Sequence, residues 1–149
     1  MKEISFTLLL SLFFATLSLG QMHNPVAWTV NADVSDDVVT LTYTATIDKG
    51  WYVYTQYLEN DMGPIPTSIN IESADIKTIG KIEEIGEKKE GYDDLFEMNI
   101  IKYANSLVLV QKVERPADLK NIKGYIEFMT CDNARCLPPA SIDFDISVK

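Results

Sequence analysis

Histidine and cysteine are scarce in this sequence, and their scarcity excludes several kinds of chemistry. The 149 residues include one histidine, His23, and two cysteines, Cys131 and Cys136. A closed zinc site takes four ligands at characteristic spacings, and a serine or cysteine hydrolase needs a nearby base, most often histidine. His23 lies more than a hundred residues before Cys131. We therefore expect no metal site, no cofactor and no hydrolytic centre, and we expect His23 to be an exposed N-terminal residue.

Basic residues are outnumbered by acidic ones. The chain has 13 Lys and Arg against 22 Asp and Glu, which gives a formal net charge of −9 at pH 7. Binding to nucleic acid depends on Lys and Arg side chains that neutralise phosphates. We therefore expect no nucleic-acid partner.

Long apolar runs are missing after the N-terminus. Ile4 to Leu19 form a nearly unbroken apolar segment behind Lys2, and the segment ends at the small residue Gly20. This pattern is typical of a secretory signal peptide, and a retained N-terminal anchor is the alternative. No other segment approaches the ~18 apolar residues of a membrane span. We therefore predict a signal peptide over residues 1–20 and one exported domain over residues 21–149, with no membrane span in the mature chain.

Sustained helical periodicity is also missing, whereas β-type alternation is frequent. From Asp37 to Ile47 every second residue is apolar and threonines occupy most of the positions between, which predicts a half-buried strand. Similar short runs are separated by Gly, Pro, Asn and Asp, and about seven or eight such strands indicate an all-β sandwich. The other predicted strands are Val26–Val34, Trp51–Tyr54, Ser68–Ile71, Met98–Tyr103, Leu107–Val113, Tyr125–Thr130 and Ile142–Val148.

A charged run and two adjacent acidic pairs show no pattern that would indicate catalysis. The charged run from Gly86 to Asp94 is expected to be a solvated loop. The adjacent pairs Glu83-Glu84 and Asp93-Asp94 would point to opposite faces of a strand. We interpret them as solubility charges rather than as an acid and a base.

The two cysteines are the remaining candidates for chemistry, because only four residues separate them. A bridge between Cys131 and Cys136 would close a loop of about six residues, which the chain-entropy model values at about 2 kcal/mol. A domain of this size can fold without covalent support, so the bridge would be a weak structural staple. Two cysteines close enough to bridge are also what thiol–disulfide exchange requires. The spacing alone leaves staple and redox pair equally open.

Several segments, taken in order, resemble the N-terminal periplasmic domain of DsbD-type thiol:disulfide interchange proteins. They are Gly50-Trp51-Tyr52-Val53-Tyr54, Gly63-Pro64-Ile65-Pro66-Thr67, Tyr92-Asp93-Asp94-Leu95-Phe96 and Cys131 to Pro139. The resemblance spans nearly the whole mature chain. It implies an immunoglobulin-like β-sandwich with a redox-active cysteine hairpin, in which Cys131 and Cys136 form a reducible disulfide.

The resemblance also implies roles for individual residues. Cys136 would form the mixed disulfide with a partner, and Cys131 would resolve it. Further roles fall on the tyrosines that flank the cysteine pair, on an aromatic residue of a cap loop that shields the sulfurs, and on an acidic residue of that loop: Tyr52, Tyr54, Phe96 and Asp94. The alternative is that both tyrosines are core aromatics and that Phe96 is the first core residue of the next strand.

The implied activity is protein-disulfide reduction in the periplasm. A thioredoxin-fold partner would reduce the domain, which would pass electrons to other exported thiol proteins. Family members usually carry a transmembrane electron conduit, so for a chain ending at Lys149 we expect a separate membrane thiol-electron transporter and a monomeric domain. The cysteine loop is one residue shorter than in the best-known members, and Leu95 stands where those members have an acidic residue. The rival hypothesis is a non-catalytic secreted binding module with a permanent disulfide.

Overall fold

The structure is a computed structural model that describes residues 24–58, 62–114, 116 and 118–148. The predicted signal peptide and His23 lie outside the described residues. Nine strands are present in the described part of the chain, and no helix is. The strands are β1 (Val26–Ser35), β2 (Val38–Ile47), β3 (Tyr52–Tyr54), β4 (Ser68–Ile71), β5 (Lys77–Asp93), β6 (Met98–Glu114), β7 (Asn121–Phe128), β8 (Thr130–Cys131) and β9 (Ala140–Ser147).

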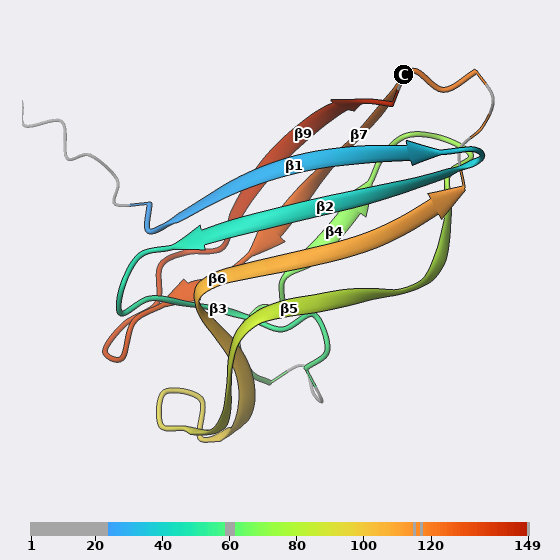
Figure 1. Cartoon of the computed structure of the whole chain (residues 1–149). Coiled ribbons are helices and arrows are strands. Elements are labelled where there is room, and N and C mark those ends of the chain that lie inside the picture. Colours follow the sequence, from blue (N-terminus) through green and yellow to red (C-terminus); the bar gives the residue numbers. More distant parts are fainter. Residues whose placement is uncertain (1–23, 59–61, 115, 117, 149) are drawn as a thin grey trace, which may run out of the picture.

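The strands form two antiparallel sheets, seen one in front of the other in Figure 1. The larger sheet has the order β1-β2-β6-β3-β8, with β5 paired to the other edge of β6, and the smaller sheet has the order β4-β7-β9. The predicted all-β sandwich is therefore confirmed. In the part of the chain that the structure describes, no helical segment is long and apolar enough to cross a membrane.

Strand β2 shows how the alternating sequence builds the core. The apolar face is almost completely buried, with exposures of 0% for Val39, Leu41, Tyr43 and Ala45 and 4% for Ile47. The intervening threonines at positions 40, 42 and 44 are half-buried. The predicted division of this strand into a core face and a threonine face is confirmed.

Aromatic pairs join the two sheets across this core. The rings of Trp28 on β1 and Phe128 on β7 have centroids 5.7 Å apart. Those of Tyr43 on β2 and Phe144 on β9 meet edge-on at 5.4 Å. Burial of such apolar surface is the main stabilising term in folding. The sandwich thus has a continuous core without any contribution from the cysteines.

The charged run expected to be a loop is the end of a strand. Segment Gly86 to Asp93 belongs to β5, which pairs with β6 in continuous register from Glu87 opposite Ala104 to Asp93 opposite Met98. Nearly all side chains in this segment are exposed, so no apolar alternation marks it as a strand. The segment is paired through backbone hydrogen bonds to β6, and its exposed side chains form ion pairs such as Lys88 Nζ to Glu90 Oε2 at 2.7 Å.

Strand β6 also runs further than expected. The separately predicted strands Met98–Tyr103 and Leu107–Val113 are one strand, interrupted by a register shift against β5. Asn105, between them, has a φ of 60°, a conformation that asparagine tolerates better than most residues. Because β6 continues past this shift, one edge of β6 pairs with the short strand β3 before the shift and with β2 after it. That arrangement places β3 between β6 and the cysteine strand β8.

Glu84 on β5 fixes the exit of β3. Its carboxylate accepts hydrogen bonds from Thr55 Oγ1 at 2.6 Å, from the Gln56 backbone N–H at 2.7 Å and from the Tyr103 hydroxyl at 3.0 Å. Thr55 is 1% exposed, so these bonds satisfy a buried hydroxyl. Glu84 is thus a structural residue, and its interpretation as a solubility charge was wrong.

Candidate functional site

The cysteines form a disulfide within a tight hairpin next to β3. Cys131 and Cys136 are bonded, and the backbone of Cys131 lies opposite Tyr52 in the β3–β8 ladder. Two backbone hydrogen bonds flank the disulfide in the hairpin. The Asp132 N–H donates to the Arg135 carbonyl, and the Leu137 N–H donates to the Thr130 carbonyl, each at 2.9 Å. The predicted pairing of the two cysteines is present in the structure.

Asp132 shapes the hairpin loop. Its Oδ1 accepts hydrogen bonds from the backbone N–H groups of Ala134 at 2.7 Å and Arg135 at 2.8 Å. This is an Asx turn, in which a side chain replaces a backbone acceptor. The two N–H groups favour the ionised carboxylate and lower the pKa of Asp132. The sequence did not single out this residue, although aspartate is common in turns because its side chain can accept backbone hydrogen bonds.

The two cysteines differ in exposure. Cys131 is 0% exposed, whereas Cys136 is partly exposed. Exchange proceeds by attack of a thiolate on one sulfur of the bridge, and the choice of sulfur depends on access. The arrangement therefore favours Cys136 as the cysteine that an incoming thiol reaches.

A small apolar cluster encloses the disulfide, apart from the main core. Its buried members are Tyr54, Ile100 and Cys131, and Phe96, Cys136 and three other apolar side chains pack against them. The rings of Tyr54 and Phe96 meet edge-on with centroids 5.8 Å apart. Phe96 lies in the turn between β5 and β6 rather than in a strand, so the alternative of a first core residue in β6 is wrong.

The two predicted tyrosines both lie on β3 but have different surroundings. Tyr54 is 1% exposed, and burial, with a smaller contribution from the charge of Asp93, raises the pKa of its phenol. Tyr52 is half-buried, and the Lys102 ammonium lies 4.4 Å from the centroid of its ring. Tyr54 thus belongs to the disulfide cluster, and Tyr52 faces a cation.

The two adjacent aspartates at the start of the turn differ in their exposure to solvent. Asp94, the predicted site residue, is exposed, whereas Asp93 is 6% exposed. Asp93 Oδ2 accepts a hydrogen bond from Lys102 Nζ at 2.7 Å, and Oδ1 accepts one from the Leu95 N–H at 3.0 Å. The interpretation of both aspartates as solubility charges was wrong for Asp93. Neither Asp93 nor Lys102 has a sequence signal that would have shown this pairing.

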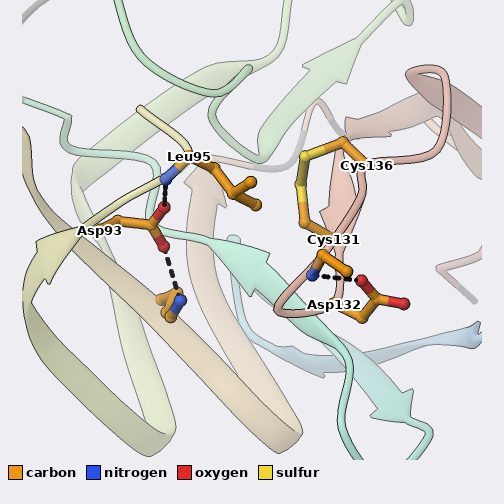
Figure 2. Close-up of polar contacts among 7 residues, drawn as sticks. Asp93, Leu95, Cys131, Asp132 and Cys136 are labelled. Carbon is orange, nitrogen blue, oxygen red and sulfur yellow. Dashed lines mark hydrogen bonds and ion pairs between the residues drawn. A yellow bond between two sulfur atoms is a disulfide. The ribbon is translucent and has the colours of Figure 1, made fainter. Parts of the chain in front are cut away.

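Figure 2 shows how the turn and the hairpin face each other. The Leu95 side chain points from the turn toward the Cys131–Cys136 bridge, and Asp93 lies on the side of Leu95 away from the bridge. Leu95 is 44% exposed. A surface depression lies between turn and hairpin, lined by Tyr92, Asp93, Asp94, Leu95, Lys102, Asp132 and Asn133. The site therefore combines a partly shielded disulfide with an adjacent hollow that contains charged residues.

Comparisons with known proteins agree with this geometry. The family described as "Thiol:disulfide interchange protein DsbD, N-terminal" matches residues 21–147. No curated protein sequence matches.

Solved structures share the fold. The Neisseria meningitidis DsbD N-terminal domain in its reduced form superposes with a TM-score of 0.54 at 21% identity, covering 81% of this chain and 85% of that one. The N-terminal periplasmic domain of Proteus mirabilis ScsB gives a TM-score of 0.57 at 14% identity, covering 84% of this chain and 46% of that one. A complex of the Neisseria meningitidis DsbD and PilB N-terminal domains gives 0.51 at 21% identity, covering 80% and 81%.

These matches confirm the expected immunoglobulin-like sandwich, and the match over residues 21–147 includes both sheets and the cysteine hairpin. The chain belongs to the family of N-terminal domains of DsbD thiol:disulfide interchange proteins.

Proposed function

We propose that this domain is a two-electron carrier in which Cys131 and Cys136 alternate between a disulfide and a dithiol. A thiolate of a reduced donor attacks Cys136 Sγ, forms a mixed disulfide and releases Cys131 as a thiolate. The donor's second thiolate then attacks the donor sulfur of the mixed disulfide, which releases Cys136 as a thiolate and the donor as a disulfide. The domain has gained two electrons, and Cys131 and Cys136 are both reduced.

Delivery reverses these steps. The Cys136 thiolate attacks an acceptor disulfide, and Cys131 attacks Cys136 Sγ to re-form the bridge and release the reduced acceptor. The observation that carries this assignment is the difference in exposure, because Cys131 is 0% exposed and Cys136 is partly exposed. Phe96 and Leu95 are proposed to form the cap, with Tyr52, Tyr54 and Asp94 as its surroundings.

The partners follow from the chemistry and from the family. We assign thioredoxin-fold proteins as exchange partners and a separate membrane thiol-electron transporter as the source of electrons. A related DsbD domain has been solved in complex with a PilB N-terminal domain, and a related ScsB domain is described as periplasmic. For this chain we propose export by the signal peptide over residues 1–20, with a monomeric carrier over residues 21–149 in the periplasm.

A trapping experiment tests the assigned roles. Purified Cys131→Ser and Cys136→Ser variants are mixed with a thioredoxin-like protein that keeps only its attacking cysteine, activated as a mixed disulfide with a small aromatic thiol, and adducts are resolved by non-reducing electrophoresis and mass spectrometry. The Cys131→Ser variant should accumulate a mixed disulfide through Cys136, because neither protein keeps a second thiol to resolve it. The Cys136→Ser variant is the matched control and should form far less adduct, because Cys131 is buried.

The reduction potential of the bridge distinguishes the proposed carrier from the rival hypothesis, which is a binding module with a permanent disulfide. Structural disulfides typically have potentials below about −300 mV, and exchangeable ones have higher values. We expect equilibration with a thioredoxin-like redox buffer to give a value above that limit. A bridge that remains closed against excess reduced thioredoxin-like protein, or equal trapping by the two variants, would contradict the proposal.

A further inference from the structure

A mostly buried ion pair lies at the base of the turn that covers the disulfide. Lys102 Nζ and Asp93 Oδ2 are 2.7 Å apart, and the two side chains are 20% and 6% exposed. The other five ion pairs of the described residues are more exposed, with at least one side chain above 45% in each. The Asp93–Lys102 pair is therefore the one that water screens least.

Asp93 connects this pair to the cap. It is the last residue of β5 and lies opposite Met98, so the two residues bracket the turn over residues 94–97. While Oδ2 contacts the cation, Oδ1 accepts the Leu95 N–H at 3.0 Å. One carboxylate thus holds the first half of the turn that carries Leu95 and Phe96.

Lys102 connects the pair to the strand beneath the disulfide. Its backbone lies opposite Tyr54 in the β3–β6 ladder, and its ammonium lies 4.4 Å from the centre of the Tyr52 ring. Tyr52 is in turn opposite Cys131. A contact of a cation with an aromatic face is attractive, so Lys102 joins the cap to the strand that positions the cysteines.

We propose that Asp93 and Lys102 are positioning residues that hold the turn over residues 94–97 closed, so that Phe96 covers the Cys131–Cys136 bridge. This inference rests on the proposed function and adds a control over access to the disulfide. Opening the turn breaks the Leu95 hydrogen bond and pulls Asp93 from its cation. A docking partner that supplies replacement contacts to either charge lowers this barrier, whereas a small thiol does not.

Substitutions that keep shape and remove charge test the proposal. Lys102→Met keeps the aliphatic stem, and Asp93→Asn keeps an oxygen that can accept the Leu95 N–H. Lys102→Arg retains the cation. Lys123→Met is the matched control, because Lys123 pairs with Asp145 across β7 and β9 at 3.1 Å in an exposed ion pair outside the site.

Two measurements on the oxidised full chain report the closed turn directly. The first is the rate of bridge reduction by dithiothreitol without denaturant, and the second is hydrogen exchange at the Leu95 amide. Lys102→Met should raise the reduction rate about tenfold, which is the size expected for the loss of a hydrogen bond to a charged group, and should speed Leu95 exchange. Lys102→Arg should restore slow reduction, and Lys123→Met should leave both rates as in the unsubstituted protein.

The urea dependence of the reduction rate distinguishes opening of the turn from global destabilisation of the protein. Reduction through the open turn should be nearly independent of urea below the unfolding transition, whereas reduction through unfolding rises steeply with it. The proposal is overturned if Lys102→Met and Asp93→Asn leave the reduction rate and Leu95 exchange unchanged, or if the faster reduction has the urea dependence of unfolding. These measurements use no protein partner, so they can succeed or fail independently of the trapping experiment.

Discussion

The ring of Phe96 meets the ring of Tyr54 edge-on, with centroids 5.8 Å apart. The contact joins a four-residue turn, formed by residues 94–97, to the strand that lies next to the cysteines. Tyr54 is fully enclosed and Phe96 is partly exposed, so the tyrosine is the fixed partner and the phenylalanine is the removable one.

Phe96→Ala should speed reduction of the bridge by small thiols. An aromatic pair of this kind contributes about 1 kcal/mol beyond its buried area, and a loss of that size raises the population of an open state about fivefold. We expect at least this increase in the rate of reduction by dithiothreitol. The cost in global stability should be small, because Phe96 is outside the main core cluster.

Phe144→Ala is the matched control for Phe96→Ala. Phe144 is also partly exposed and also meets a tyrosine ring edge-on, but it packs on the main core through Tyr43. Its removal should lower the free energy of unfolding by about 3 kcal/mol and leave native-state reduction unchanged. A Phe96→Ala protein that loses stability to the same extent, with an unchanged reduction rate, would identify Phe96 as core packing.

The turn made by Asp132 should give the hairpin a pH-dependent stability. Backbone hydrogen bonds lower the pKa of Asp132 in the folded protein, so the unfolded chain protonates first as the pH falls. The stabilisation is therefore complete above the unfolded pKa of about 3.9 and is lost as the pH falls through the lower folded pKa. The urea midpoint of Asp132→Ala should lie below that of the unsubstituted protein at pH 6, and the difference should shrink at pH 3.

Asp132→Asn separates charge from hydrogen bonding in this test. Asparagine keeps an oxygen for the Ala134 and Arg135 N–H groups at every pH. The loss of stability in Asp132→Asn, relative to the unsubstituted protein, should therefore be smaller than the loss in Asp132→Ala. Hydrogen exchange at the same two amides gives a local readout. A difference between Asp132→Ala and the unsubstituted protein that grows as the pH falls would refute the assigned role.

Glu84→Ala should destabilise the sandwich by about 2 kcal/mol, because it leaves the buried Thr55 hydroxyl without its acceptor. Thr55 Oγ1, the Gln56 N–H and the Tyr103 hydroxyl all donate to this carboxylate. Glu83→Ala removes the neighbouring exposed carboxylate and should change stability by less than about 0.5 kcal/mol. Urea unfolding of the two variants measures the contrast, and equal losses would show that the Glu84 hydrogen bonds contribute nothing specific.

The sandwich was predictable where burial is one-sided. Strand β2 has one face in the core and one face of threonines, so its sequence alternates, and its predicted inner face is the buried one. The part of β5 from Gly86 to Tyr92 is exposed on both faces and carries mainly lysine, glutamate and glycine. Backbone hydrogen bonds to β6 stabilise this part of β5, and such bonds require no alternation of polar and apolar side chains. The sequence therefore could not distinguish this strand from a loop.

The site was predictable in its cysteines and aromatic residues but not in its charges. The spacing of Cys131 and Cys136 brings them within reach of each other in any tight hairpin, and they are bonded. Which of two adjacent aspartates is buried depends on the position of a lysine nine residues later, across a turn whose geometry no local pattern sets. The roles of Tyr52, Asp94 and Phe96 in exchange remain predictions.

The cluster around the disulfide and the main core share no residue. Substitutions at the cysteine end can therefore accumulate without disturbing the contacts that join the two sheets, so the surroundings of the disulfide and the packing of the sandwich are under separate constraints. For protein engineering, the turn over residues 94–97 and the loop over residues 133–135 can be exchanged together as one unit, with Asp132 kept as the residue that shapes the hairpin. Libraries built on those seven positions would vary the surface next to the disulfide on an unchanged scaffold.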